Sequence, residues 1–491
     1  MNKVATLASA LACASAATAA AASPPATDIC GEAAPAEGSE QPSAAAVARL
    51  AKDWFDRINS ADDAAYVRFL EERGPVLRGG REQWLQLRDF MRGFQLCGVK
   101  SVEADAVEMW MFDPNFDTWA VMRFKPGAAE ADKAGLVAHW ATDEAPPGAV
   151  RPAKLAPAAL VQALAARAAS RAGENRFSGA VLLAQNGRVL FQKAYGLADR
   201  ERRKPNRLDT QFRFGSMGKM FTAIAIMQLV EKGRIDLDSP IGRYLPGYPN
   251  QDVATKVTVA NLLSHTGGTG DIFGPEFQRR KASLRSAKDY VDLYGGRAPE
   301  FAPGSRQAYS NYGFMLLGRI VEQVSGLPYD DYLQRNIFKP VGMASTGNRP
   351  ESEVLPRRAV GYMGSGARLR SADDTLPVNG TPAGGGYSTV GDFNRFIGGL
   401  TAHRLLRAET LRKLIEGGVT MADGKFAGFD FGGTMGDAGR FIGHGGGAPG
   451  MSGSLQHFLD SGMTLIVLAN RDPGTAESIA LFAAHRLPAK K

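Results

Sequence analysis

The chain has 491 residues, of which 44% are hydrophobic and 22% are charged, and its formal net charge is +8 at pH 7. This length allows two or three domains, and the composition is that of an ordinary globular protein. The basic residues form no Lys/Arg block, so the charge predicts neither nucleic acid nor a membrane surface as a partner. After the first 22 residues, no stretch is apolar for long enough to span a bilayer.

Residues 1–22 have the pattern of a secretory signal peptide. Lys3 supplies a short positive start, an apolar run of small residues follows, and A-x-A sites recur at its end. Cys13 follows Ala-Leu-Ala, which leaves a lipoprotein anchor as the alternative. The mature chain would keep Cys30 and Cys97, which could form one disulfide in an oxidising compartment. We therefore expect an exported protein, periplasmic or extracellular.

Residues 23–44 are rich in Ala, Pro, Ser and Glu and are typical of a flexible leader. Residues 45–146 predict a small α+β domain with helical spacing in its first half and strands in its second. The expected strands, joined in part by an Asp-Pro-Asn turn, are 107–112, 118–124 and 136–140. Helices followed by a curved antiparallel sheet resemble the cone-shaped folds of the nuclear-transport-factor or ketosteroid-isomerase type. An accessory role is expected for this domain.

A linker at 147–154, rich in Pro, leads into a second α+β domain at 155–488. A helix at 156–174 is followed by two apolar runs around Asn186-Gly187, which is a strong hairpin signal. A long helical region comes next, and the chain then returns to strands and a last helix at 440–443, 454–459, 463–468 and 476–487. These elements predict one antiparallel sheet flanked by the terminal helices, with a helical insertion.

The most buried-looking helix covers residues 220–230, which are apolar on all sides and end before Lys232-Gly233. Ser216 and Lys219 stand at its start, one helical turn apart and on the same face. The positive end of a helix disfavours an ammonium and favours an oxyanion, and burial lowers the pKa of a lysine in the same direction. Lys219 could then accept the proton of Ser216 and activate it as a nucleophile.

Tyr309-Ser-Asn311 is the second candidate segment. Tyr309 could act as general base or acid if Lys219 lowers its phenol pKa, and Asn311 could donate an amide hydrogen bond to a substrate carbonyl. The alternative is a tyrosine that only precedes a helix starting near Asn311.

A third segment, Gly443-His444-Gly445-Gly446-Gly447, follows an apolar strand. Glycines in an edge strand allow a ligand or another backbone to come close. The N–H groups of Ser216 and Gly447 could form an oxyanion hole. The alternative for His444 is a turn histidine without a role.

Other signals are weak. The glycines at 445, 447 and 450 match a dinucleotide fingerprint, but Pro449 interrupts them and no helix follows. The six histidines have no metal-ligand spacing, and no serine stands in a G-x-S-x-G motif. We expect no metal and no cofactor.

The three segments, in this order, resemble the class C β-lactamase and penicillin-binding serine hydrolase family. The likeness covers about residues 156–487 and includes an L-L-x-H-T-x-G stretch at 262–268. The resemblance implies that Ser216 is acylated, Lys219 is its proton partner and Tyr309 assists. It implies substrate-binding roles for the residues Asn311, His444, Gly446 and Gly447.

The third segment departs from the β-lactamase pattern, which has Lys-Thr-Gly where this chain has His444-Gly-Gly. A histidine is mostly neutral near pH 7, whereas a lysine there helps to hold a substrate carboxylate. The H-x-G form is similar to esterase and D-aminopeptidase members. We therefore expect a serine hydrolase for esters, D-amino-acid amides or peptides, or β-lactams. The alternative function is a catalytically silent module that binds cell-wall peptides.

Overall fold

The computed structural model describes Cys30 and residues 42–60, 62–72, 81–103, 106–126, 134–142, 145–375 and 377–488. The expected signal peptide and lipoprotein site lie outside the described residues. Helix α1 begins at Pro42, so residues 42–44 belong to the front unit and not to the leader.

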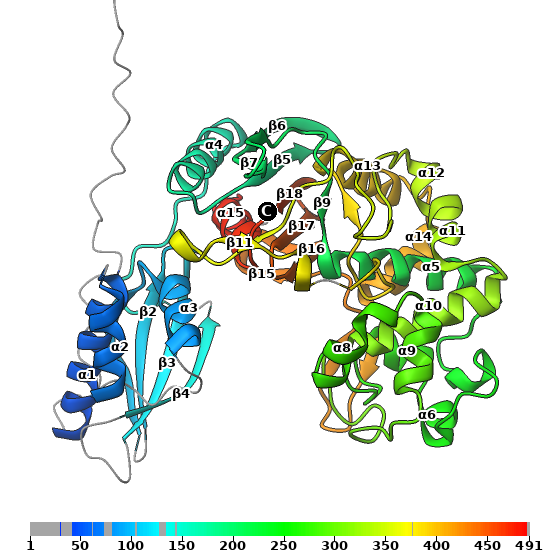
Figure 1. The fold of residues 1–491 in the computed structure, drawn as a ribbon, viewed down its shortest axis with the longest axis horizontal. Coiled ribbons are helices and arrows are strands. Elements are labelled where there is room, and N and C mark those ends of the chain that lie inside the picture. The colour runs from blue at the N-terminus through cyan, green and yellow to red at the C-terminus, as the bar shows by residue number, and fades with distance from the viewer. Residues whose placement is uncertain are drawn as a thin grey trace, which may run out of the picture.

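The front unit places three helices before an antiparallel sheet (Figure 1). Its helices are α1 (Pro42–Asn59), α2 (Asp63–Glu72) and α3 (Arg81–Met91), and its strands are β1 (Gln95–Glu103), β2 (Ala106–Asp113), β3 (Thr118–Pro126) and β4 (Ala134–Thr142). The strands pair in chain order, β1-β2-β3-β4. The three predicted strands are present, whereas β1 and α2 were not predicted. Strand β1 has two register irregularities, which break the alternation that marks a strand.

Aromatic residues build the core of this unit. Trp54 and Tyr66 from the helices pack with Met111 and Phe124 of the sheet, and all four are buried. Cys30 and Cys97 are joined by a disulfide, which fastens the chain before α1 to β1. The likeness to a cone-shaped fold stays a prediction.

The second unit is organised around a six-stranded antiparallel sheet in the order β15-β16-β17-β18-β5-β6. Its strands are β5 (Gly179–Gln185), β6 (Arg188–Tyr195), β15 (Gly433–Met435), β16 (Gly439–Ala448), β17 (Met451–Phe458) and β18 (Met463–Ala469). Asn186 and Gly187 take the positive φ angles that the hairpin between β5 and β6 requires. Strand β16 is longer than predicted and includes the whole glycine segment, because pairing with β17 continues through Gly447 to Ala448.

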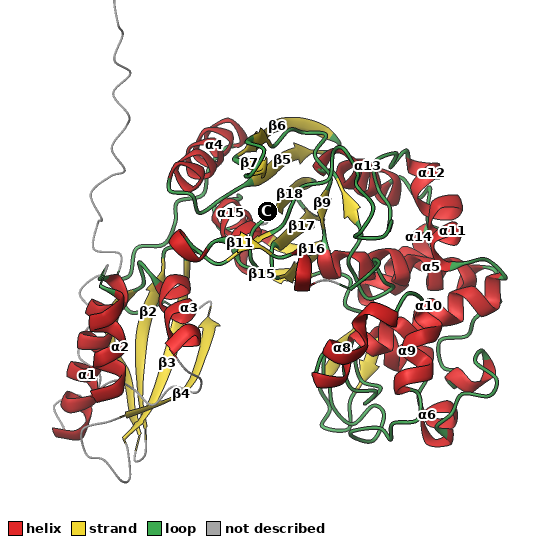
Figure 2. Cartoon of the chain, viewed as in Figure 1, coloured by secondary structure: helices red, strands yellow, loops and turns green. Residues whose placement is uncertain are grey.

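Helices cover both faces of the sheet, as Figure 2 shows. Because side chains alternate along a strand, Val181 of β5 faces α4 (Pro157–Gly173) and α15 (Thr475–Ala484), while Leu182 faces α5 (Lys219–Glu231) and α13 (Val390–Thr401). The predicted arrangement of terminal helices on one face of an antiparallel sheet is confirmed.

Between the first and last strands of the sheet, the chain builds a helical lobe and small strands. The further helices are α6 (Gln251–Lys256), α7 (Val259–Leu263), α8 (Pro275–Arg280), α9 (Ala287–Tyr294), α10 (Asn311–Ser325), α11 (Tyr329–Leu333), α12 (Lys339–Val341) and α14 (Ala408–Glu416). The short strands are β7 (Leu197–Asp199), β8 (Lys204–Pro205), β9 (Phe212–Arg213), β10 (Tyr362–Met363), β11 (Arg370–Ser371), β12 (Tyr387–Ser388), β13 (Gly418–Thr420) and β14 (Phe426–Gly428).

The loop between β2 and β3 docks the front unit on the terminal helices of the second. Arg167 of α4 donates hydrogen bonds to the carbonyl oxygens of Pro114 and Asn115, at 2.7 and 2.8 Å. Arg486, just after α15, pairs with Asp117. The contact is therefore made through cations of the second unit and oxygens of the front unit.

A second contact reaches towards the glycine strand. Asp89 of the front unit pairs with Arg368, in the loop between β10 and β11. Asp472 accepts the N–H of Gly364 in that loop at 2.6 Å and the N–H of Gly450, just after β16, at 2.9 Å. The front unit is thus tied to the loop that supports the end of β16.

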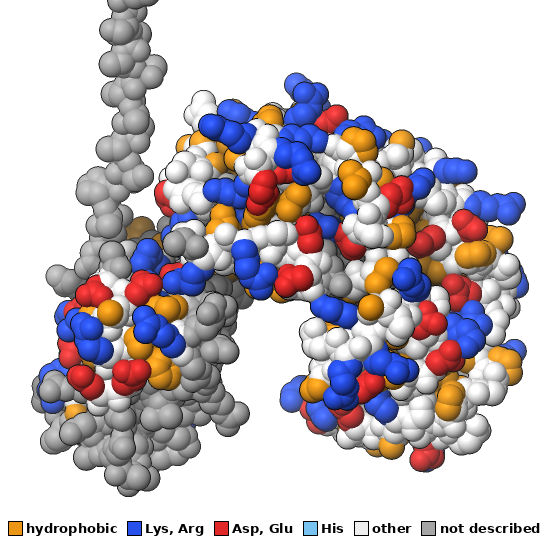
Figure 3. Space-filling model, in the orientation of Figure 1, with side chains coloured by type: hydrophobic (Ala, Val, Ile, Leu, Met, Phe, Trp, Pro, Cys, Tyr) orange, Lys and Arg blue, Asp and Glu red, His pale blue; other side chains and the backbone are white. Residues whose placement is uncertain are grey.

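On the face shown in Figure 3, cationic and anionic side chains are interspersed. This agrees with the absence of a charge block in the sequence. Across the described ranges, every helix is too short or too polar to cross a membrane.

Helix α5 is the centre of the second unit, as its apolar sequence predicted. Its residues from Lys219 to Leu229 are buried. The ring of Phe221 lies 5.0 to 5.9 Å from four other phenyl rings, those of Phe214, Phe338, Phe393 and Phe396. Aromatic pairs at these distances stabilise a core beyond simple burial of area.

We predict that Phe221→Ala lowers the free energy of unfolding by about 3–5 kcal/mol, because the cavity cannot close among four rings. Urea unfolding followed by far-ultraviolet circular dichroism measures this, with Val354→Ala, at a 91% exposed position, as control. All five tryptophans lie in residues 54–140, so their fluorescence follows the front unit separately. A shift no larger than that of the control would contradict the packing described.

Candidate active site

Ser216 lies on a 3₁₀ turn, η1 (Gly215–Gly218), directly before α5. The sequence predicted that Ser216 and Lys219 lie on one turn of an α-helix. In the structure, Ser216 lies on the 3₁₀ turn, which is tighter than an α-helical turn, and Lys219 is the first residue of the α-helix. The Lys219 Nζ lies 3.4 Å from the Ser216 Oγ. Ser216 is partly exposed while Lys219 is 1% exposed, so the hydroxyl opens to solvent and the amine does not.

The Lys219 amine is held by two further oxygens. It donates to the Asn311 Oδ1 at 2.8 Å and to the Ala383 carbonyl oxygen. Burial lowers the pKa of Lys219 from 10.5 to about 7, although the carboxylates of Asp430 and Asp271 act in the opposite direction. In its neutral form the amine gives both N–H groups to these acceptors. Its lone pair is then left for the proton of the Ser216 hydroxyl.

Tyr309 lies on the other side of the serine, and its hydroxyl donates to the Ser216 Oγ at 2.9 Å. The Lys219 Nζ stands 4.8 Å from the centre of the Tyr309 ring. The expectation of a lowered phenol pKa is wrong. Desolvation raises the pKa of Tyr309, and Asp430 and Asp271 raise it further, while the bond with Ser216 acts against this. Tyr309 is therefore suited to donate a proton and not to exist as a tyrosinate near neutral pH.

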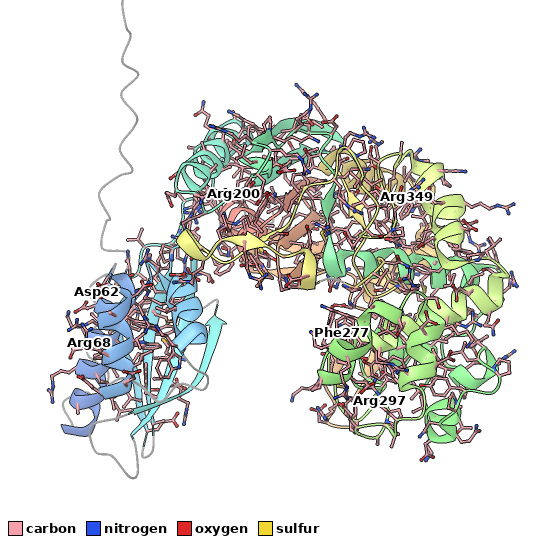
Figure 4. All side chains as sticks on the ribbon, in the orientation of Figure 1. Asp62, Arg68, Arg200, Phe277, Arg297 and Arg349 are labelled. Atoms are coloured by element: carbon pink, nitrogen blue, oxygen red, sulfur yellow. A yellow bond between two sulfur atoms is a disulfide. The ribbon has the colours of Figure 1, made fainter. Side chains whose placement is uncertain are left out.

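Asn311 begins α10 and is 8% exposed. Its Nδ2 donates to Asp271 at 3.3 Å, so its Oδ1 faces Lys219. Arg297, which Figure 4 labels in the helical lobe, donates to the carbonyl oxygens of Asp271 and Thr269 and so fixes this loop. The structure thus gives Asn311 a role in positioning Lys219 that sequence reasoning missed. Its predicted contact with substrate stays a prediction.

Glycines let three backbone segments meet at the serine turn. A Cβ on Gly446 would lie 2.0 Å from the Phe214 carbonyl oxygen, and one on Gly384 would lie 2.6 Å from the Gly215 carbonyl oxygen. Gly215 itself has φ +54°, and a Cβ there would lie 2.8 Å from the Gly447 nitrogen. The Gly447 N–H is therefore next to the turn that carries Ser216, where a second oxyanion donor is needed. Gly446 is buried in this packing, and its predicted contact with substrate stays a prediction.

His444 of β16 lies near a second histidine, His265, which belongs to the L-L-x-H-T-x-G stretch at 262–268. The Nε2 atoms of His444 and His265 lie 2.9 and 3.0 Å from the same oxygen, Oδ2 of Asp430. The ring of His265 also lies 4.5 Å from that of Tyr309. Asp430 and Asp271 escaped the sequence reasoning because each is a single carboxylate in a loop without a motif.

A hydroxyl between a buried amine and a phenol, on this sheet and helix arrangement, defines a serine hydrolase. The chain belongs to the beta-lactamase family, whose sequence model matches residues 158–490. The resemblance to penicillin-binding serine hydrolases is thereby confirmed.

Penicillin-binding protein 4* of Bacillus subtilis is 29% identical over 329 residues, 63% of this chain and 72% of its own. Esterase EstB of Burkholderia gladioli is 32% identical over 277 residues, 48% of this chain and 69% of its own. The crystal structure of a D-stereospecific amidohydrolase from Streptomyces sp. superposes with a TM-score of 0.54 and 28% identity, covering 66% of this chain and 98% of that one. Relatives with three different names therefore match this chain, and the family model, which begins at residue 158, does not include the front unit.

We predict that kcat/KM for a chromogenic acetate ester rises with pH through an apparent pKa near 7. The Lys219 pKa is about 7, so the amine becomes able to accept a proton only as pH rises past that value. Rates corrected for spontaneous hydrolysis between pH 5 and 9 would measure this. A profile that is flat from pH 5 to 9, or that is still rising at pH 9 without levelling off, would rule out a desolvated Lys219.

Proposed function

We propose that this protein is an exported serine hydrolase that acts through a covalent acyl-enzyme on esters and D-amino-acid amides or peptides. The observation that carries the proposal is the position of the Ser216 Oγ, 3.4 Å from the Lys219 Nζ and 2.9 Å from the Tyr309 hydroxyl. A proton acceptor and a proton donor thus flank one nucleophile.

In the acylation step, the Ser216 Oγ attacks the substrate carbonyl while its proton passes to Lys219. The carbonyl oxygen becomes an oxyanion, for which the N–H groups of Ser216 and Gly447 are the donors. The bond to the leaving group then breaks. Tyr309, whose phenol is protonated, gives its own proton to the departing oxygen or nitrogen. The proton on Lys219 restores the phenol.

Deacylation repeats these steps with water in place of the serine hydroxyl. Water loses a proton to the amine of Lys219, adds to the acyl carbon, and releases the acid and the free Ser216 hydroxyl. The raised pKa of Tyr309 and the lowered pKa of Lys219 favour the lysine as the base that the sequence left undecided.

Export is supported by the pattern of residues 1–22 and by the disulfide between Cys30 and Cys97, since disulfides persist in oxidising compartments. The substrate class is supported by His444 in place of a lysine, and by relatives whose names include an esterase and a D-stereospecific amidohydrolase. We propose no cofactor, because the side chains described supply nucleophile, base and acid.

We predict that Ser216→Ala abolishes hydrolysis of a chromogenic acetate ester and labelling by a fluorophosphonate probe, because the bond to the acyl group forms on its hydroxyl. Ser283→Ala, in an exposed turn, is the matched control and should keep full activity. Activity that survives in Ser216→Ala would reject the mechanism. An intact protein that neither hydrolyses the ester nor takes up the probe would be the silent peptide-binding module.

We predict that His444→Lys raises kcat/KM for a chromogenic cephalosporin relative to an uncharged acetate ester. A lysine carries a permanent charge that attracts the carboxylate of the drug, whereas the histidine ring is engaged with Asp430. The ratio of the two rates, measured in wild type and variant, cancels any general loss of activity. An unchanged ratio would contradict our account of the third segment.

A further inference from the structure

Asp430 lies between two histidines that come from different parts of the second unit. Its Oδ2 is shared by His265, which follows α7 in the helical lobe, and His444, which lies on β16 beyond the residues that pair with β15. Burial would raise the pKa of Asp430, but the hydrogen bonds from both histidines outweigh it and hold the pKa below its usual value. Asp430 is therefore a carboxylate between two imidazole rings.

The bond to His265 reaches the catalytic tyrosine. The His265 Nδ1 accepts the N–H of Ser310 at 3.1 Å, so its Nε2 carries the proton and donates it to Asp430. The same ring lies 4.5 Å from the ring of Tyr309 at an interplanar angle of 33°. By fixing the His265 ring, Asp430 limits how far Tyr309 can turn away from Ser216.

Both ends of this contact have unusual backbone geometry. His265 and Asp430 have φ values of +57° and +52°, in the left-handed region that residues other than glycine rarely occupy. Such strain persists where the surrounding structure requires it, and it concentrates at functional positions. Here the left-handed backbone conformation directs the His265 and Asp430 side chains towards each other.

The bond to His444 changes the charge that a substrate meets. An anion that approaches the His444 Nε2 must displace Asp430 or lie within a few ångströms of its carboxylate. A cavity of about 280 Å³ is lined by Asp430 and His444, and by no lysine or arginine among the described residues. The ion-pair partner of His444 is thus a carboxylate, whereas a carboxylate-binding site needs an excess of cations.

We propose that Asp430 is a positioning and specificity-determining residue: it braces His265 beneath Tyr309, and it makes the site discriminate against substrates with a carboxylate next to the scissile bond. The preferred leaving groups are neutral or cationic. This inference rests on the proposed function, since it concerns the substrates of the same Ser216 site.

Three thioesters of N-benzoylglycine test the charge preference, with thioglycolate, thioglycolamide and thiocholine as anionic, neutral and cationic leaving thiols. Released thiol gives kcat/KM for each. For the wild type, we expect the anionic thioester to be poorer than the neutral one by about tenfold or more, since charges a few ångströms apart in a partly exposed site interact this strongly. The cationic thioester should equal or exceed the neutral one. This comparison needs no variant to fold.

Asp430→Asn removes the charge and keeps the shape of the side chain. It should raise the anionic-to-neutral ratio of kcat/KM by about tenfold. Asp423→Asn, an exposed carboxylate in the turn between β13 and β14, makes the same charge change away from the histidines and should leave the ratio unchanged. Equal ratios for wild type and Asp430→Asn would overturn the specificity role.

A readout independent of turnover tests the positioning role. In ¹⁵N-histidine-labelled protein, Asp430→Asn should shift the imidazole signals of His265 and His444, assigned through single His→Gln variants, and leave those of His457 in place. Unchanged signals would overturn the brace. If the wild type cleaves none of the thioesters, the proposed function fails, and the imidazole signals still decide whether Asp430 holds the two rings.

Discussion

The active site depends on the removal of one amine from water. Lys219 starts a helix whose next ten residues are buried, and burial lowers its pKa from 10.5 to about 7. At about 1.4 kcal/mol for each pKa unit, this opposes the charged form by roughly 5 kcal/mol. The two oxygens that accept its hydrogen bonds, on Asn311 and Ala383, keep the amine in place without restoring full hydration. The same burial therefore stabilises the core and prepares the base.

Close backbone packing around the serine follows from this arrangement. Glycines at 215, 384 and 446 allow the turn before α5, the segment before β12 and the strand β16 to touch, where any Cβ would clash. The end of β16 is in turn fixed by Asp472, whose other partner is the loop that binds Asp89 of the front unit. A continuous series of contacts, through Arg368, its loop and Asp472, therefore links the front unit to the end of β16, which contains Gly447.

Two aspartates near the serine supply negative charge, and their side chains contact different residues. Asp271 orients the amide of Asn311 towards Lys219, and Asp430 lies within hydrogen-bond distance of both His265 and His444. Both carboxylates favour a charged Lys219, but desolvation outweighs them. The pKa of Tyr309 is raised, so in the proposed mechanism Lys219 accepts a proton and Tyr309 donates one.

Local patterns in the sequence determined the elements: the apolar run of α5, the Asn-Gly hairpin of β5 and β6, and the three segments with Ser216, Tyr309 and His444 all carry signals within a few residues. A local pattern does not say how close two distant segments lie in the folded protein. The raised pKa of Tyr309, the amide orientation of Asn311 and the histidine pair on Asp430 were decided by the tertiary structure alone. Each depends on desolvation or on contacts between residues that are 14 to 165 positions apart in the chain, and burial and approach of that kind exist only once the chain has folded.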